Sequence, residues 1–130
     1  MAASSFARMS IRWEVPAGET RPITVALHGL MMAIRLESGC TRCSLSIELG
    51  ERSSVSYFEE FSTQAGLESR LQGGRFASLA ALLEQATGPP LIEFALPGGI
   101  RGLDYVEEVH RRQDAAIGER SGIRSRDNRG

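Results

Sequence analysis

The sequence predicts a single α+β domain with a ferredoxin-like fold, in which both helical segments pack on one face of a four-stranded antiparallel sheet. Segments with alternating apolar residues, typical of strands, are interleaved with segments whose apolar residues recur every three or four positions, typical of helices. Their order is β-α-β-β-α-β, which is the split βαβ arrangement. The expected strands span 9–15, 43–49, 54–61 and 91–96, and the expected helical segments span 20–38 and 62–83.

The composition fits an ordinary globular domain and gives no sign of a nucleic-acid or membrane partner. The chain has 130 residues, of which 42% are hydrophobic and 24% charged, and its formal net charge is −1. A nearly neutral chain lacks the basic footprint that nucleic acid or an anionic membrane attracts. No apolar run approaches the roughly eighteen residues that cross a bilayer, and the start lacks the apolar core of a secretory signal. We therefore expect a cytoplasmic protein.

Apolar periodicity defines the first strand and the first helix. Ile11, Trp13 and Val15 alternate with polar residues and so share one face of a strand. Pro22 suits the first turn of the following helix, where a missing amide hydrogen costs nothing. Gly39 suits the position just after that helix ends. The apolar stripe of the helix consists of Ile23, Ala26, Leu27, Leu30, Met31 and Ile34.

The middle of the chain predicts a hairpin followed by an interrupted helix. The strands at 43–49 and 54–61 are joined by the short turn at 50–53, which makes them antiparallel neighbours. Ser62 can cap the next helix, because its hydroxyl can accept a hydrogen bond from a free amide of the first turn. Two adjacent glycines then interrupt this helix, since glycine is unfavourable in a helix interior.

The ends of the chain look less regular than its centre. Residues 1–8 form a loose lead-in, residues 9–97 form the domain, and residues 98–130 form a C-terminal extension. Apolar residues at three-residue spacing predict a short helix at about 103–112 in this extension. Charged and small residues dominate from 113 onward, so we expect the end to be disordered.

The sheet face turned away from the helices carries a mixture of polar and apolar side chains. A second copy commonly covers a sheet face of this size, which predicts a two-fold homodimer through the sheet. The residues expected on this face include Arg12, Glu14, Ser44, Ser46, Ser54, Ser56, Phe58, Glu60 and Glu93.

Glu59 is the leading candidate for an acid–base residue. It shares the inner side of the third strand with Tyr57 and Phe61, and Arg70 follows about two helical turns later. One interpretation is a buried ion pair that fastens helix to strand. The other is a catalytic base, or a group that holds a substrate hydroxyl, whose pKa is set by burial and by Arg70.

His28 is the other candidate for proton transfer. It lies just outside the apolar stripe of the first helix, so it is either a boundary residue or a pocket residue able to shuttle a proton. His110 lies far away in the sequence beside two arginines. Because the two histidines are so far apart, we expect no metal site.

Cys40 and Cys43 form a single C-x-x-C motif. A redox motif of this kind needs its first cysteine at a helix N-terminus, where the dipole lowers the thiol pKa, and here a strand follows instead. A zinc site needs four ligands, and there is no second cysteine pair. The spacing therefore predicts no site.

The aromatic and methionine residues suggest a pocket for a small aromatic molecule. Tyr57 and Trp13 offer flat apolar surface together with a hydrogen-bonding group, and methionines adapt to irregular shapes. The same residues at core periodicity also fit an ordinary hydrophobic core. The residues completing such a pocket would be Met31, Met32, Phe61 and Phe76.

Four short patterns resemble the antibiotic biosynthesis monooxygenase family of dimeric α+β barrels over about residues 9–97. These are Pro16-Ala-Gly-Glu19 after the first strand, Glu37-Ser-Gly-Cys40 at the entry to the second, Tyr57-Phe-Glu-Glu-Phe61 before a helix, and Arg75-Phe76 after a helix break.

The resemblance implies a homodimer with sheets packed face to face and a pocket between each sheet and its own helices. It also implies oxidation of an aromatic or quinol-type substrate by O₂ without a metal or cofactor, as in some members.

The chain departs from the family pattern at four positions. Phe58 and Phe61 stand where tyrosine and tryptophan are frequent, Arg70 where a histidine is common, and Cys43 where an aromatic residue is usual. These departures keep two further functions open on the same fold. One is a non-catalytic small-molecule-binding or assembly dimer, and the other is a cofactor-free isomerase or cyclase.

Overall fold

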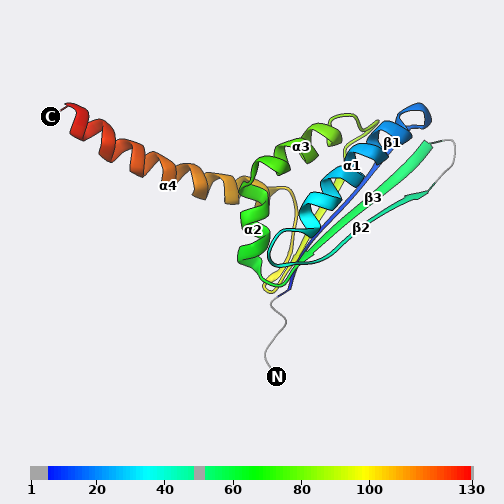
Figure 1. Ribbon diagram of the computed structural model, residues 1–130, viewed down its shortest axis with the longest axis horizontal. Helices are drawn as coiled ribbons and strands as arrows, with labels where there is room; N and C mark the ends of the chain where they lie inside the picture. Colours follow the sequence, from blue (N-terminus) through cyan, green and yellow to red (C-terminus); the bar gives the residue numbers. More distant parts are fainter. Residues whose placement is uncertain (1–5, 49–51, 130) are drawn as a thin grey trace, which may run out of the picture.

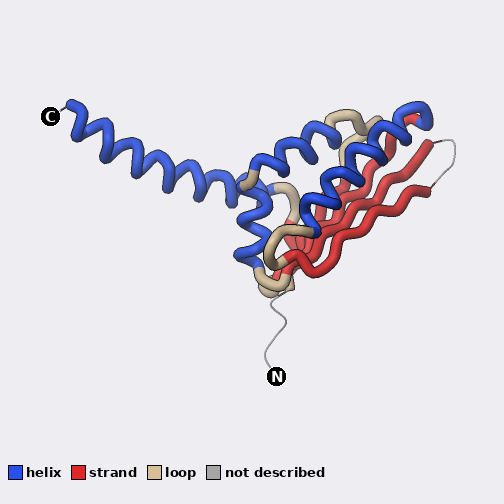
Figure 2. The backbone as a smooth tube through the Cα atoms, viewed as in Figure 1, coloured by secondary structure: helices blue, strands red, loops and turns tan. Residues whose placement is uncertain are grey.

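The computed structural model describes residues 6–48 and 52–129, and its helices α1 to α3 lie on one side of an antiparallel sheet (Figures 1 and 2). Among the described residues the sheet has five strands in the order β2-β3-β1-β4-β5. The elements are β1 (Ala7–Pro16), a 3₁₀ turn (Ala17–Glu19), α1 (Thr20–Arg35), β2 (Cys40–Glu48), β3 (Arg52–Phe61), α2 (Gln64–Gln72), α3 (Gly74–Leu83), β4 (Leu91–Leu96), β5 (Gly99–Arg101) and α4 (Asp104–Arg129).

The predicted α+β class and the β-α-β-β-α-β order are confirmed. Strand β1 is central because it pairs with both β3 and β4. Its residues alternate between buried and exposed over its whole length, as its apolar pattern predicts. One face of the sheet therefore meets the helices and the other is open.

Helix α1 packs on the sheet through four of the six residues of its predicted apolar stripe, whereas Ala26 is exposed and Leu30 is half-buried. Ile23, Leu27, Met31 and Ile34 are all buried, and their spacing of three and four residues puts them on one side of the helix. Gly39 follows the helix with a φ of 89°. Glycine adopts this left-handed conformation without steric cost, so it lets the chain turn back into β2.

The second helical segment differs in detail from the prediction. It forms two helices, α2 and α3, separated at Gly73, whose extended backbone ends the first helix. The cap is Thr63 rather than Ser62, because the Thr63 hydroxyl accepts a hydrogen bond from the Gly66 amide at 3.0 Å. Hydroxyl side chains at either position suit a cap, so the sequence pattern alone did not distinguish them.

The C-terminal part contains two features that the sequence did not predict. A short fifth strand, β5, pairs with β4 just beyond residue 97, where the domain was expected to end. The expected helix at 103–112 is the start of α4, which continues to Arg129 and extends away from the sheet (Figure 1). No proline follows Pro97 to stop it, and Ala115 and Ala116 favour helix.

Two further expectations fall partly outside the described residues. Leu49, Gly50 and Glu51 are not among them, whereas Ser53 of the expected turn belongs to β3. Residues 1–5 of the expected lead-in are also outside, and β1 already begins at Ala7. Within the part of the chain that is described, no helix combines the length and apolar character needed to cross a membrane.

Candidate functional site

A buried ion pair between Glu59 and Arg70 lies where helix α2 meets the sheet. Glu59 projects from the inner face of β3, directly between Met9 of β1 and Cys43 of β2. Arg70 comes from the last turn of α2 and meets it in a bidentate arrangement, with Nε 2.9 Å from Oε1 and Nη2 3.0 Å from Oε2. The two residues are only 0% and 2% exposed. The two side chains are therefore in contact, as the sequence analysis expected.

Tyr57 and Cys43 extend this pair into a hydrogen-bonded chain. The Tyr57 hydroxyl donates to Glu59 Oε2, and the Cys43 thiol donates to Tyr57 Oη over 3.5 Å. All four residues are buried. We call Cys43, Tyr57, Glu59 and Arg70 the core network, because they form one polar line through an otherwise apolar layer.

Burial and the Glu59 charge set the protonation of the core network. Burial, followed by the charge of Glu59, raises the pKa of the Tyr57 hydroxyl far above its usual value. For Arg70, burial alone would lower the pKa, but the bonds to Glu59 outweigh this effect and raise it. At neutral pH Tyr57 is therefore a neutral donor and Arg70 a cation.

The Nη1 amino group of Arg70 in the core network has no hydrogen-bond partner among the described residues. It is also buried. A buried donor without an acceptor costs about 1–3 kcal/mol. The unpaired N–H is therefore a place where an oxygen atom of a bound molecule would gain a strong, charge-assisted hydrogen bond.

The predicted pocket residues divide into buried and exposed ones. Five of them lie in the core, whereas His28 and Met32 are exposed on α1. His28 follows Leu27 and Met32 follows Met31 along the helix. One position corresponds to a rotation of about 100° around the helix axis, so each side chain points away from the sheet. His28 is therefore not part of the core network. The five buried residues are Trp13, Met31, Tyr57, Phe61 and Phe76.

Trp13 is buried at the other end of β1 from the core network. It pairs with Val55, whereas Glu59 pairs with Met9, four residues away along the strand. Its indole Nε1 has no hydrogen-bond partner among the described residues. Trp13 and Arg70 thus each carry an unpaired N–H, but a single small molecule at Glu59 would not reach Trp13, since four residues of strand span about 13 Å.

A hollow of about 240 Å³ lies on the open face of the sheet, not between the sheet and its helices. It is bordered by Arg12 and Glu93 at one side and Phe58 at the other. Arg42 stacks over the Phe58 ring, 5.5 Å from its centroid. The serines lining this hollow are Ser10, Ser44, Ser46 and Ser56.

His110 has a structural position between α4 and the α2–α3 pair. Its Nε2 lies 2.8 Å from the Leu71 carbonyl oxygen, and its ring meets Phe76 edge to face at 5.8 Å. Within the described ranges, no three or more His, Cys, Asp or Glu residues gather in a way that suits a metal ion.

The Cys43–Tyr57 contact is the part of the core network that the sequence analysis missed. The hairpin register puts Leu45 opposite Tyr57 and Cys43 opposite Glu59. Diagonal neighbours across a strand pair are within reach of long side chains. The hairpin register was thus the signal that could have revealed the contact.

The fold and the core network together define the class to which this structure belongs, a ferredoxin-like α+β domain with a buried acid on its third strand. Solved structures with this fold include proteins provisionally named antibiotic biosynthesis monooxygenases. One is from Nitrosomonas europaea, with a TM-score of 0.62 and 11% sequence identity; the matched region covers 78% of this chain and 93% of that protein's chain. Another is from Caulobacter crescentus, with a TM-score of 0.62 and 16% sequence identity; the matched region covers 71% of this chain and 89% of that protein's chain.

A third similar structure is a Nitrosomonas europaea protein of unknown function, with a TM-score of 0.59 at 24% identity, covering 73% of this chain and 91% of its own. These likenesses establish the fold that the sequence resemblance predicted. Neither a protein-family model nor a curated protein sequence matched the chain.

Proposed function

We propose that this protein oxidises a small aromatic or quinol-type molecule with O₂, using the core network and no metal or organic cofactor. The observation that carries the proposal is the buried Glu59–Arg70 pair with its unpaired Arg70 N–H. The provisional monooxygenase names of two structures with the same fold support it.

The energetics of the pair favour a functional role. Removing two charges from water costs several kcal/mol per ion, and their attraction often fails to offset this cost. Apolar side chains of similar volume are frequently as stabilising at such a position. A fully buried acid with a hydrogen-bonded tyrosine and a spare guanidinium N–H is therefore better explained by chemistry than by stability.

The core network supplies the groups that a cofactor-free oxidation requires. The spare Arg70 N–H binds the ring oxygen of the substrate and stabilises the anion that forms when Glu59 accepts a proton from it. The electron-rich anion then reduces O₂ directly. With an anthrone, the ring CH₂ becomes a carbonyl: one oxygen atom enters the substrate, and the other leaves as water with both CH₂ hydrogens.

The substrate must reach a site that is closed in this structure. Arg70 is in the last turn of α2, three residues before the break at Gly73. A break between two short helices is a natural hinge, because few backbone hydrogen bonds cross it. Outward movement of α2 about Gly73 would open the space above Glu59 and free Arg70 from part of its pairing.

An oxygen electrode tests this proposal with metal-stripped protein and a panel of hydroquinones and anthrones. We expect uptake of one O₂ per substrate oxidised, unchanged by chelators. Tyr57→Phe removes the hydroxyl bonded to Glu59 and should lower the rate by at least tenfold, because general acid–base groups typically contribute about 10²–10⁴-fold.

Tyr105→Phe is the matched control. Tyr105 also donates its hydroxyl to a glutamate, Glu68, at 2.7 Å, but on the α2–α4 contact and away from Glu59. This variant should retain the wild-type rate. Absence of uptake across the whole panel from folded wild-type protein would refute the oxygenase proposal, as would equal rates in the two tyrosine variants.

A non-catalytic binding or assembly dimer is the second candidate, and one observation favours it. Both oxygens of Glu59 are already bonded to Arg70, while the hollow of about 240 Å³ lies on the open sheet face. A small aromatic ligand would then stabilise the protein against heat without any O₂ uptake. An isomerase or cyclase would instead convert its substrate under anaerobic conditions.

We also propose that the open face is covered by a second copy of the chain. The face combines charged and apolar groups, with Arg8 bonded to Glu60 at 3.0 Å and Arg42 stacked on Phe58. A surface that carries both charge signs and apolar groups can be complementary to itself, as an interface around a two-fold axis requires.

A further inference from the structure

Strand β2 contains a bulge that changes the direction of one of its two cysteines. Cys40 pairs with Phe61 and Arg42 pairs with Glu60, so Thr41 is an extra residue with no partner position of its own. In a regular strand, residues three positions apart face opposite sides. The extra residue reverses this, and Cys40 and Cys43 lie opposite Phe61 and Glu59, which share the inner face.

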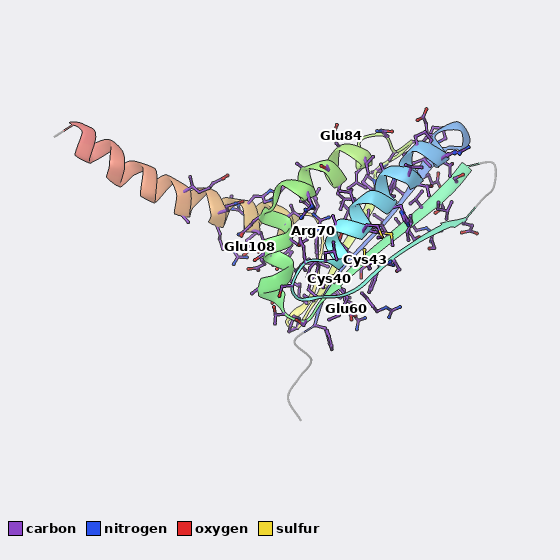
Figure 3. All side chains as sticks on the ribbon, in the orientation of Figure 1. Cys40, Cys43, Glu60, Arg70, Glu84 and Glu108 are labelled. Atoms are coloured by element: carbon purple, nitrogen blue, oxygen red, sulfur yellow. The ribbon has the colours of Figure 1, made fainter. Side chains whose placement is uncertain are left out.

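Burial agrees with this geometry. Thr41 and Arg42 are exposed, Cys40 is half-buried and Cys43 is buried. The Thr41 hydroxyl donates to the Glu60 carboxylate at 2.9 Å, which agrees with the outward direction that the backbone register gives the extra residue. Both cysteines are free thiols at the start of β2 (Figure 3).

The bulge makes the two cysteines neighbours on one face of β2. Neighbouring residues on one face of a strand have Cα atoms about 6.6 Å apart, twice the rise per residue. The Cα atoms of a disulfide are usually separated by about 4.4–6.8 Å and its Cβ atoms by about 3.5–4.5 Å, so closing the bond requires the bulged start of β2 to bend and bring the two parallel side chains together. The bulge thus gives the C-x-x-C motif the geometry of adjacent same-face residues.

Reagents can reach this pair from solvent. Both cysteines line a surface hollow of about 310 Å³ together with Arg35, Thr41 and Arg42. Arg35 donates to the Cys43 carbonyl oxygen at 2.9 Å and anchors α1 beside the hollow. The half-buried Cys40 is the more accessible thiol.

We propose that Cys40 and Cys43 form a dithiol that peroxides oxidise to an intramolecular disulfide. The Cys40 sulfur attacks one peroxide oxygen, the O–O bond breaks, and Cys40 becomes a sulfenic acid while water leaves when the peroxide is H₂O₂. The Cys43 sulfur then attacks Cys40, the S–O bond breaks, and a second water leaves. The two thiols lose two electrons and two protons, and the peroxide is reduced to two waters.

The charged groups around the pair set its reactivity. For Cys40, burial and the nearby Glu59 raise the thiol pKa, and the backbone contact with Arg42 and the charge of Arg35 oppose this only in part. Burial and Glu59 raise the Cys43 pKa as well, although its contact with Tyr57 opposes this. Oxidation is therefore slow at neutral pH, because the thiolate is the reactive form.

Oxidation would change the core network directly. The Cys43 S–H donates to Tyr57 Oη, and a disulfide sulfur has no hydrogen to donate. The inference does not depend on the proposed oxygenase activity, because the contact exists in the resting protein.

Peptide mapping after oxidation tests the proposal without any activity assay. The full chain is treated with a small molar excess of hydrogen peroxide, alkylated under denaturing conditions and digested with trypsin. Trypsin cuts after Arg42, between the two cysteines, so a disulfide leaves peptides 36–42 and 43–52 joined. We expect the joined peptides as the main product, in protein of monomer mass that has lost two hydrogens.

The matched control is the double variant Cys40→Ser with Thr41→Cys. It keeps two cysteines and brings them closer in sequence, but position 41 faces outward and Cys43 faces inward. We expect little of the joined product, and both changes are at positions that tolerate substitution because neither is fully buried. Equal yields from the control and the wild type would overturn the proposal. A wild-type product that consists of over-oxidised cysteines or of intermolecular disulfides would also overturn it. So would the absence of any reaction.

Discussion

Glu59 and Arg70 are each the other's only charged partner within hydrogen-bonding distance among the described residues, and both are almost completely buried. Removing one member therefore leaves the other as an unpaired charge in an apolar layer. Glu59→Gln should lower the free energy of unfolding by about 3–5 kcal/mol, the usual effect of breaking a buried ion pair. Chemical denaturation monitored by circular dichroism measures this.

Glu37→Gln is the matched comparison at the surface. Glu37 pairs with Arg75 at 3.0 Å, but both side chains are substantially exposed. An exposed ion pair contributes at most about 1 kcal/mol, so this variant should remain close to wild type. Similar losses in the two variants would mean that burial does not set the strength of the Glu59 pair.

Sequence reasoning predicted part of the site at this scale. Alternation along β3 put Tyr57 and Glu59 on one face, and helical spacing brought Arg70 within reach. His28 and Met32 were included because they adjoin the apolar stripe, yet one position on a helix is enough to turn a side chain into solvent. The shared face of Cys40 and Cys43 depends on a bulge, and alternation cannot reveal an inserted residue.

Helix α4 is fastened to α2 by a polar cluster on Glu68. Tyr105 donates to Glu68 at 2.7 Å, and Arg112 lies 3.0 Å from the same carboxylate. Burial works against ionisation of Glu68, but the hydrogen bonds from Tyr105 and Arg112 outweigh it and hold its pKa below the usual value. The ionised carboxylate is therefore part of what docks the helix.

The lowered pKa of Glu68 determines how the stability of the protein changes with pH. A carboxyl whose pKa is lower in the folded state stabilises the protein above its unfolded pKa, near 4.3, and loses this contribution as the pH falls through the folded value. Between about pH 5 and pH 3, the wild type should therefore lose more stability than Glu68→Gln. Glu84→Gln, at an exposed position just after helix α3, should follow the wild type. Parallel curves for all three proteins would contradict this assignment.

Two physical causes limit how well the sequence predicts the helices and strands. Strong periodicity over ten or more residues located β1, α1 and β3 within a few positions. The short strand β5 has only three residues, too few to show a period, and its pairing with β4 depends on tertiary contacts. The length of α4 was underestimated because its apolar edge ends early, although helix-forming residues continue.

At the scale of the whole molecule, the open sheet face sets the expected assembly. Phe58 lies on this face beneath the Arg42 guanidinium, opposite Ser44 on β2 and Ser10 on β1. A charge placed there would be buried by a second copy, whereas a monomer would tolerate it. Light scattering coupled to size exclusion should show a dimer for the wild type and a monomer for Phe58→Glu.

Val25→Glu is the control, because Val25 is 66% exposed on α1, on the helical side of the sheet. It should remain dimeric. A monomeric wild type, or a Phe58→Glu variant as dimeric as Val25→Glu, would show that the open face is not the interface.

The most direct test of the central claim replaces the buried pair as a whole, with Glu59→Leu and Arg70→Met in one protein. If the pair serves chemistry rather than stability, the free energy of unfolding should be unchanged or higher, because apolar replacement of a buried ion pair is often neutral or stabilising by about 1–4 kcal/mol. Substrate-dependent O₂ uptake should at the same time be lost. A double variant that is less stable by several kcal/mol, or one that still consumes O₂ at the wild-type rate, would contradict the account.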